Sequence, residues 1–270
     1  MATVAEVVGY AGYKGILFGV ECEVEGERLP EVLPRGLPIH VEADGSLRGG
    51  LEYVFSKPLK KNIALKSLSV LFSQFEEAKS KLDYSFRTST HVHVNVSDVQ
   101  VSKVLNIIFL YTLVEDLFVH YCAEHRRGNR FCLRFKEAQH LYHILEQMIQ
   151  YARNGREGHV IAVLDQQVTK YAALNLYTLR KYGTLEFRSL EGTNDLEKIS
   201  KWIDAIENLV TVAQKYDSIS ALHEAFFNDP EKIVDEIFTS PEFKYDGWRA
   251  GIEESYSQSF HLVLVDKGVF

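Results

Sequence analysis

The sequence predicts an α+β fold in which helices gather on one face of a sheet. Short segments of alternating polar and apolar residues, typical of half-buried strands, are separated by longer segments whose apolar residues recur at helical spacing. With 270 residues, 46% of them hydrophobic, the chain is long enough to bury a substantial core. We expect one large domain over residues 1–217 and a C-terminal helical extension over residues 218–270 that packs on it.

The first half of the chain predicts strands and two long helices. Residues 16–25 predict a strand, and residues 41–56 predict a turn at Asp44-Gly45-Ser46 followed by a strand over residues 50–55. The prolines between these strands predict a loop or an edge segment. Helical periodicity follows at residues 62–82 and 102–124, on either side of a strand around His91.

The second half predicts further helices and one pair of strands. Residues 135–152 predict a helix, and a glycine-containing segment over residues 154–158 ends it. Residues 171–189 predict two strands that turn at Lys181-Tyr182-Gly183. A helix is expected over residues 195–216, and two or three short helices over residues 219–260, one of them opened by Asn228-Asp229-Pro230.

Three of the predicted strands each place two ligand-capable side chains two positions apart. The pairs are Glu21 with Glu23, His91 with His93, and Glu186 with Arg188. Side chains on a strand alternate between faces, so each pair points to one side and its apolar neighbours point to the other. If the three strands share a sheet, one face carries carboxylates, imidazoles and a guanidinium, which suits a divalent metal and a phosphate.

Each pair alone also has an ordinary structural interpretation. Two glutamates on a strand usually mark a solvated face, and Glu186 with Arg188 would form an ion pair of little energetic value. Partly buried histidines are common as well. The interpretation as a site depends on all three pairs occurring together, with Glu52 on a further strand. Carboxylates with one imidazole favour Mg²⁺ or Mn²⁺, whereas two histidines with one glutamate would suit Zn²⁺.

The sequence lacks the glycine-rich loops that usually hold nucleotides. It contains neither the P-loop motif nor GxGxxG, so a nucleotide phosphate would be bound through metal and arginine. The arginine-rich segment at residues 126–134 is either a solvated basic patch or a clamp for phosphate or carboxylate. Arg130 and Arg134 are the cofactor-binding candidates within it.

The composition of the chain excludes several classes of protein. Cys22, Cys122 and Cys132 form no CxxC motif, which argues against a disulfide framework or a thiolate zinc site and predicts buried thiols. The net charge of −7 disfavours sequence-independent binding of nucleic acid. No run of about 18 or more apolar residues and no signal-peptide pattern occurs, so we expect a cytosolic protein without a membrane partner.

These motifs, in this order, resemble the amidoligase family of carboxylate-amine ligases, which is related to glutamine synthetase and glutamate-cysteine ligase. The resemblance runs from about residue 15 to residue 193, and its specificity lies in the ordered set. The motifs are Gly19-Val20-Glu21-Cys22-Glu23, Asp44-Gly45-Ser46-Leu47, Gly50-Leu51-Glu52-Tyr53-Val54, His91-Val92-His93-Val94-Asn95, Ala173-Leu174-Asn175-Leu176 and Gly183-Thr184-Leu185-Glu186-Phe187-Arg188.

The resemblance implies a glutamine-synthetase-like catalytic fold, a curved antiparallel sheet backed by helices with ATP and Mg²⁺ or Mn²⁺ in its trough. It implies a small-molecule or peptide carboxylate and an amine donor as substrates, joined through an acyl phosphate. The implied metal ligands are Glu21, Glu23, Glu52, His91 and Glu186. Arg188 would contact the transferring phosphoryl group, with His93 a second phosphate contact, and Glu23 and Glu186 would share the catalytic role with Arg188.

The chain departs from the family pattern at two places, and two other functions stay open. Ser89-Thr90 stands where the family has a glycine, and Lys170-Tyr171 stands where it has an arginine. A non-catalytic binding protein on the same fold is one alternative. A zinc hydrolase built on His91, His93 and a glutamate is another, although no HExxH motif occurs.

Overall fold

The computed structural model describes residues 2–164 and 171–269, so Lys170 lies outside the described residues. Within them, seven strands form one sheet: β1 (Phe18–Glu27), β2 (Ile39–Glu42), β3 (Gly50–Phe55), β4 (Lys81–Asp83), β5 (Thr90–Asn95), β6 (Leu174–Asn175) and β7 (Thr184–Phe187). The helices are α1 (Val4–Val8), α2 (Lys61–Glu77), α3 (Val101–Tyr121), α4 (Gln139–Arg153), α5 (Glu157–Ala162), α7 (Tyr177–Tyr182), α8 (Leu196–Gln214), α9 (Ile219–Asn228), α10 (Pro230–Ile237) and α11 (Trp248–Lys267).

The sheet is antiparallel throughout, in the order β2-β3-β1-β5-β7-β6, and β4 pairs with the end of β1. The long strand β1 therefore lies at the centre, between the strand that carries Glu52 and the strand that carries the histidines. The segment rich in proline forms a loop, one of the two predicted possibilities, and leads into the edge strand β2.

The apolar face of the sheet packs against helices. The ring of Tyr53 on β3 lies 5.1 Å from that of Phe75 on α2. At the other end of the sheet, the ring of Phe187 on β7 lies 5.5 Å from Tyr111 and 5.7 Å from Phe118, both on α3. Burial of these large side chains is a main source of stability for such a layer. The predicted α+β class, with an antiparallel sheet backed by helices, is confirmed.

The predicted helix starts are confirmed where the sequence offers a capping residue. The Asp195 side chain accepts a hydrogen bond from the backbone N–H of Lys198 at the start of α8. Asp229 does the same for Lys232 at the start of α10, with Pro230 in the first turn. A side-chain oxygen at this position satisfies a backbone donor that has no partner inside the helix.

Three predicted elements differ in the structure. The helix expected over residues 62–82 ends at Glu77, and residues 81–83 form the strand β4. The strands over residues 171–189 are separated by α7 rather than by a tight turn, and Gly183 ends that helix with a positive φ of 67°. The C-terminal region holds two short helices, as predicted, but also the 20-residue α11. Its mixed pattern does not show the clean amphipathic period by which a long helix is recognised.

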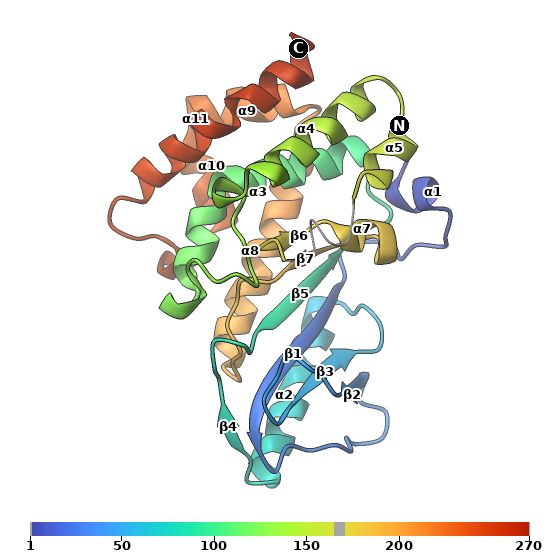
Figure 1. Ribbon diagram of the computed structural model, residues 1–270, viewed down its shortest axis with the longest axis vertical. Coiled ribbons are helices and arrows are strands. Elements are labelled where there is room, and N and C mark those ends of the chain that lie inside the picture. Colours follow the sequence, from blue (N-terminus) through green and yellow to red (C-terminus); the bar gives the residue numbers. More distant parts are fainter. Residues whose placement is uncertain (1, 165–170, 270) are drawn as a thin grey trace.

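Figure 1 shows the strands β1 to β4 with α2 in the lower part of the molecule, and α3, α4 and the C-terminal helices gathered above. The helix α3 is, in the described part of the chain, the one helix that is long and apolar enough to cross a membrane. However, 94% of its most apolar window is buried inside the protein. This burial is typical of the central helix of a folded domain.

Candidate metal and phosphate site

The strand register brings the predicted polar pairs together on one face. Glu21 of β1 is paired with His91 of β5, and His93 of β5 is paired with Glu186 of β7. On the other side of β1, Glu23 is paired with Glu52 of β3. Since residues in register on neighbouring strands have adjacent side chains, these groups form one continuous cluster.

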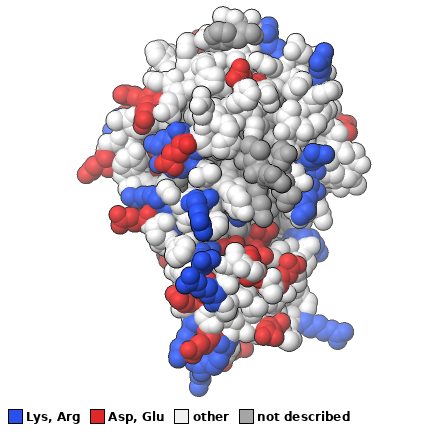
Figure 2. All heavy atoms as spheres, in the orientation of Figure 1, with Lys and Arg blue, Asp and Glu red and all other residues white. Residues whose placement is uncertain are grey.

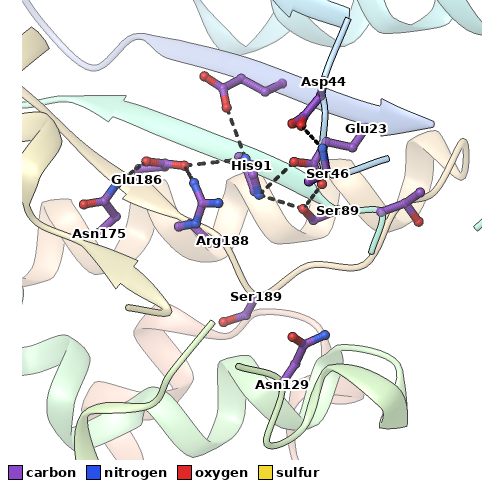
Figure 3. Close-up of polar contacts among 12 residues, drawn as sticks. Glu23, Asp44, Ser46, Ser89, His91, Asn129, Asn175, Glu186, Arg188 and Ser189 are labelled. Carbon is purple, nitrogen blue, oxygen red and sulfur yellow. Dashed lines mark hydrogen bonds and ion pairs between the residues drawn. The ribbon is translucent and has the colours of Figure 1, made fainter. Parts of the chain in front are cut away.

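His91 lies at the centre of this cluster, with 2% of its surface exposed. Its Nδ1 lies 3.1 Å from Glu21 Oε2 and 3.5 Å from Glu186 Oε1. Its Nε2 shares a hydrogen bond of 2.6 Å with Ser89 Oγ, which itself donates to Glu23. Figure 3 shows His91 between Glu186 on one side and Ser89 with Glu23 on the other.

Glu186 links this centre to the predicted phosphate contact. It is 3% exposed, and its two oxygens accept hydrogen bonds from Arg188 Nη1 and, at 2.6 Å, from Asn175 Nδ2. His93 Nε2 lies 3.2 Å from Glu21 and 4.0 Å from Glu186, and its Nδ1 shares a 3.1 Å hydrogen bond with Thr184. Arg188 and His93 therefore both border the carboxylates of the cluster.

The donor atoms of the cluster fit a divalent cation. Glu21, His91 and Glu186 each offer one ligand atom such that all three lie within 4.8 Å of one another, and Glu23, Glu52 and His91 do the same. Four carboxylates around one imidazole are hard oxygen-rich donors, which suit Mg²⁺ or Mn²⁺ better than a thiolate-binding ion. All five predicted metal ligands are thus brought together.

The buried charges shift the acidity of these groups. Burial acts to raise the pKa of Glu21, but hydrogen bonds from His91 and His93 outweigh it and hold that pKa well below its usual range. Burial, together with the neighbouring charges of Glu21 and Glu23, raises the pKa of Glu52 to about 8. The raised pKa of Glu52 thus reflects how close the carboxylates of this face lie to one another.

Residues of the cluster line two separate pockets. The larger has a volume of about 410 Å³, and Glu21, Glu52 and His93 are among its lining residues. The exposed rings of Tyr13 and Tyr182 also line it. The smaller, of about 150 Å³, is lined by Glu23, Asp44, Ser46, Arg87, Ser89, Phe131, Tyr171 and Arg188.

The arginine-rich segment is placed differently from the other candidates. Arg134 forms an ion pair with Asp116 on α3, and Arg130 lies over the ring of Phe131 with its guanidinium carbon 4.9 Å from the ring centroid. Neither lines the two pockets, so the structure does not bring them together with the cluster. Arg126 is buried and donates hydrogen bonds to the backbone carbonyls of Arg188 and Ser189, at 2.7 and 3.1 Å.

Several residues at the site were not predicted from the sequence. Ser89 connects Glu23 with His91, and Asn175 holds Glu186. The buried carboxylate of Glu25 accepts a 2.6 Å hydrogen bond from the backbone N–H of Arg48 and so ties the loop over residues 44–49 to β1. Alternation along β1 places Glu25 on the same face as Glu21 and Glu23, so this residue could have been predicted. Contacts made by loops leave no such pattern in the sequence.

An antiparallel sheet of an α+β fold that carries carboxylates and imidazoles on one face, next to a buried arginine, is a candidate site for a metal ion and a phosphate. The chain belongs to the family described as "Putative amidoligase enzyme", whose model matches residues 52–210. The predicted family membership is confirmed. The matched region begins at Glu52 and includes His91 and His93 of β5, together with Glu186 and Arg188.

One solved structure, "Crystal structure of novel glutamine synthase homolog", matches this chain with a TM-score of 0.42 and 10% sequence identity. The similarity covers 93% of this chain and 68% of that chain. No curated protein matches the sequence significantly.

Proposed function

We propose that this protein is an ATP-dependent ligase that joins a carboxylate to an amine through an acyl phosphate. The observation that carries the proposal is the convergence of four carboxylates and two imidazoles beside Arg188, with some of these residues lining the larger pocket and others the smaller. Family membership supports the ligase class. Because an ATP-dependent enzyme needs a supply of ATP, we propose that this protein acts in the cytosol.

The larger pocket is the proposed nucleotide site. Its volume of about 410 Å³ falls in the range of small-molecule and cofactor sites. Tyr13 and Tyr182 are 50% and 49% exposed, and such rings offer faces on which a purine can stack. Glu21, Glu52 and His93 line the same pocket, which directs the triphosphate toward the cluster.

The acid substrate is proposed to enter from the smaller pocket. Its carboxylate oxygen attacks the γ-phosphorus of ATP, the bond to the β–γ bridging oxygen breaks, and ADP leaves with that electron pair. Arg188 disperses the charge that develops on the transferring phosphoryl group. Bound by Glu21, Glu23, Glu52, His91 and Glu186, divalent cations would neutralise the phosphate charge that these carboxylates otherwise repel.

The second step forms the amide. The amine nitrogen attacks the carbonyl carbon of the acyl phosphate, a C–N bond forms, and the C–O bond to phosphate breaks. The amine gives its proton to a carboxylate that lines the smaller pocket, Glu23 or Asp44, and inorganic phosphate leaves. Burial of the cluster limits the access of water, which would otherwise hydrolyse the intermediate.

The test is ADP release from ATP with a mixed pool of amino acids, polyamines and short peptides, with Mg²⁺ or Mn²⁺. We expect release only when acid, amine and metal are all present, and no release in chelator. Equal release without acid and amine would indicate a plain ATPase. No release in any mixture would favour a non-catalytic binding protein, and activity with Zn²⁺ on amides without ATP would favour a hydrolase.

A further inference from the structure

The smaller pocket presents a second arginine that the proposed chemistry does not use. Arg87 lies in the segment before β5 and lines this pocket together with Arg188. Two guanidinium groups at the wall of one pocket favour an anionic ligand. Arg188 is bonded to Glu186 and is assigned to the phosphoryl group, so Arg87 is available to a different anion.

The Arg87 side chain is held in place but keeps donor capacity. Its Nη1 donates a 2.9 Å hydrogen bond to the carbonyl of Ser46, and its guanidinium lies over the ring of Phe86, 5.3 Å from the centroid. Its Nε is buried and has no hydrogen-bond partner within residues 2–164 and 171–269. A buried donor without a partner is costly, and a ligand oxygen would remove that cost.

The size and walls of the pocket limit this ligand. Its volume of about 150 Å³ is well below that of sites for drug-sized molecules. Phe131 and Tyr171 line it with rings whose centroids are 6.2 Å apart, which provides an apolar wall. A small molecule with a short carbon chain therefore fits better than a nucleotide or a peptide.

Asp44 adds a group of opposite charge. Its carboxylate lines the pocket and accepts a 2.6 Å hydrogen bond from the backbone N–H of Ser46. Among the described residues, no lysine, arginine or histidine forms an ion pair with it. Figure 3 shows Asp44 and Ser46 beside Glu23, at the edge of the cluster. This carboxylate is positioned to receive an ammonium group.

We propose that the smaller pocket binds a free α-amino acid, whose carboxylate is held by Arg87 and whose ammonium group faces Asp44. The amino acid is one of the two substrates of the proposed ligase, so this inference rests on the proposed function. A guanidinium and a carboxylate that line one small pocket match the two charges that every free amino acid carries near neutral pH.

The test compares wild type with Arg87→Ala, Arg87→Lys and the control Arg48→Ala, which removes an exposed arginine from the neighbouring loop. Arg87→Ala should raise the KM for the amino acid by roughly 10- to 100-fold, with the KM for ATP nearly unchanged. Lysine should restore part of the loss. With the α-amide of the same amino acid, which lacks the carboxylate, wild type and Arg87→Ala should react alike. An equal loss with acid and α-amide would overturn the proposal.

The role of the amino acid follows from the product. Formation of a bond at its nitrogen assigns it as the amine donor, and activation of its side-chain carboxylate assigns it as the acid. If wild type releases no ADP with any mixture, the proposed function fails while this site remains testable. Calorimetry with free amino acids and metal-loaded protein should then still show binding that Arg87→Ala weakens and Arg48→Ala does not. Absence of such binding would overturn the inference itself.

Discussion

At the scale of single residues, the position of Arg188 depends on contacts from two directions. Its Nη1 is bonded to Glu186, and its backbone carbonyl accepts a hydrogen bond from the buried Arg126. The arginine-rich segment thus contributes a buried guanidinium that supports the end of β7. A charged group held in this way needs little reorganisation when charge develops on a substrate.

Replacement of Arg188 should therefore affect turnover more than nucleotide binding. We expect Arg188→Ala to reduce ADP release by roughly 10²–10³-fold while ATP affinity changes little, because the donor acts on charge that develops in the transition state. Arg188→Lys should restore little activity, since an ammonium lacks the planar fork. Arg180→Ala, which removes an exposed arginine from α7, is the control. A parallel loss of ATP binding in Arg188→Ala would contradict the assigned role.

Replacement of Glu186 should weaken metal binding without unfolding the protein. Glu186→Gln is nearly isosteric but removes the charge of a proposed ligand, so Mn²⁺ affinity measured by calorimetry should fall by at least about tenfold. Circular dichroism should remain that of wild type. Glu76→Gln on the exposed face of α2 is the matched control. Unchanged Mn²⁺ affinity in Glu186→Gln would remove this residue from the ligand set.

The residues of the cluster were predictable because they lie on strands. Alternation along β1, β5 and β7 determines which side chains share a face, and the register then aligns Glu21 with His91 and His93 with Glu186. Ser89, Asp44 and Arg87 reach the site from segments outside regular strands. Their approach depends on tertiary packing, which no period in the sequence encodes.

At the scale of elements, short segments were the hardest to predict. The strand β6 has two residues and α7 has six, too few for either to display a period. Gly183 correctly marked a chain reversal, but it ends a helix instead of forming a hairpin turn. Long segments with a strong apolar pattern, such as α3 and α8, were predicted within about three residues, whereas the predicted end of α2 ran into β4.

The helix α3 carries a buried acid that should make stability depend on pH. Burial raises the pKa of Glu115 to about 7, against hydrogen bonds from the backbone N–H of Phe135 and the charge of Arg134. The native state therefore keeps a proton that the unfolded state has lost. Between the ordinary pKa of a glutamate and about 7, the free energy of unfolding should fall as pH rises.

Glu115→Gln tests this dependence, because glutamine cannot ionise. Relative to this variant, wild type should lose on the order of 2–3 kcal/mol of unfolding free energy between pH 5 and pH 8. Urea unfolding of both proteins across this range provides the measurement. A difference between the two proteins that stays constant with pH would contradict the assigned shift.

At the scale of the whole molecule, the C-terminal helices pack on the rest of the chain. The helix α11 contacts α3 and α4, and α10 contacts α8. Apolar side chains of this region are buried, among them Phe226, Ile237, Phe243 and Leu262. Figure 1 shows these helices beside α3 and α4. We therefore propose that residues 218–270 form one cooperative unit with residues 1–217.

Removal of residues 218–270 should abolish the native fold, because it exposes the faces of α3 and α8 that these helices cover. In the full chain, calorimetry should give one unfolding transition whose calorimetric and van't Hoff enthalpies agree. A fragment of residues 1–217 that unfolds cooperatively as a monomer would contradict this prediction. It would show instead that the extension folds separately.

The charge distribution of the molecule matches the proposed chemistry. Acidic side chains gather across the middle of the face in Figure 2, over the region where Figure 1 places β1 and β5. Clustered negative charge in a hollow attracts cations and raises their local concentration. The fold class and most residues of the cluster could be predicted from the strand and helix patterns of the sequence. The arrangement of charge over two pockets could be seen only in the folded structure.

The central claim is that an acyl phosphate links ATP cleavage to amide formation, and transfer of labelled oxygen tests it most directly. The acid substrate found in the ADP-release assay is prepared with ¹⁸O in its reacting carboxylate, and the phosphate released is measured by mass spectrometry. If the carboxylate attacks the γ-phosphorus, its oxygen leaves with the phosphate when the amine displaces it. The account predicts one labelled oxygen in each phosphate released. Unlabelled phosphate alongside normal formation of the amide would contradict it.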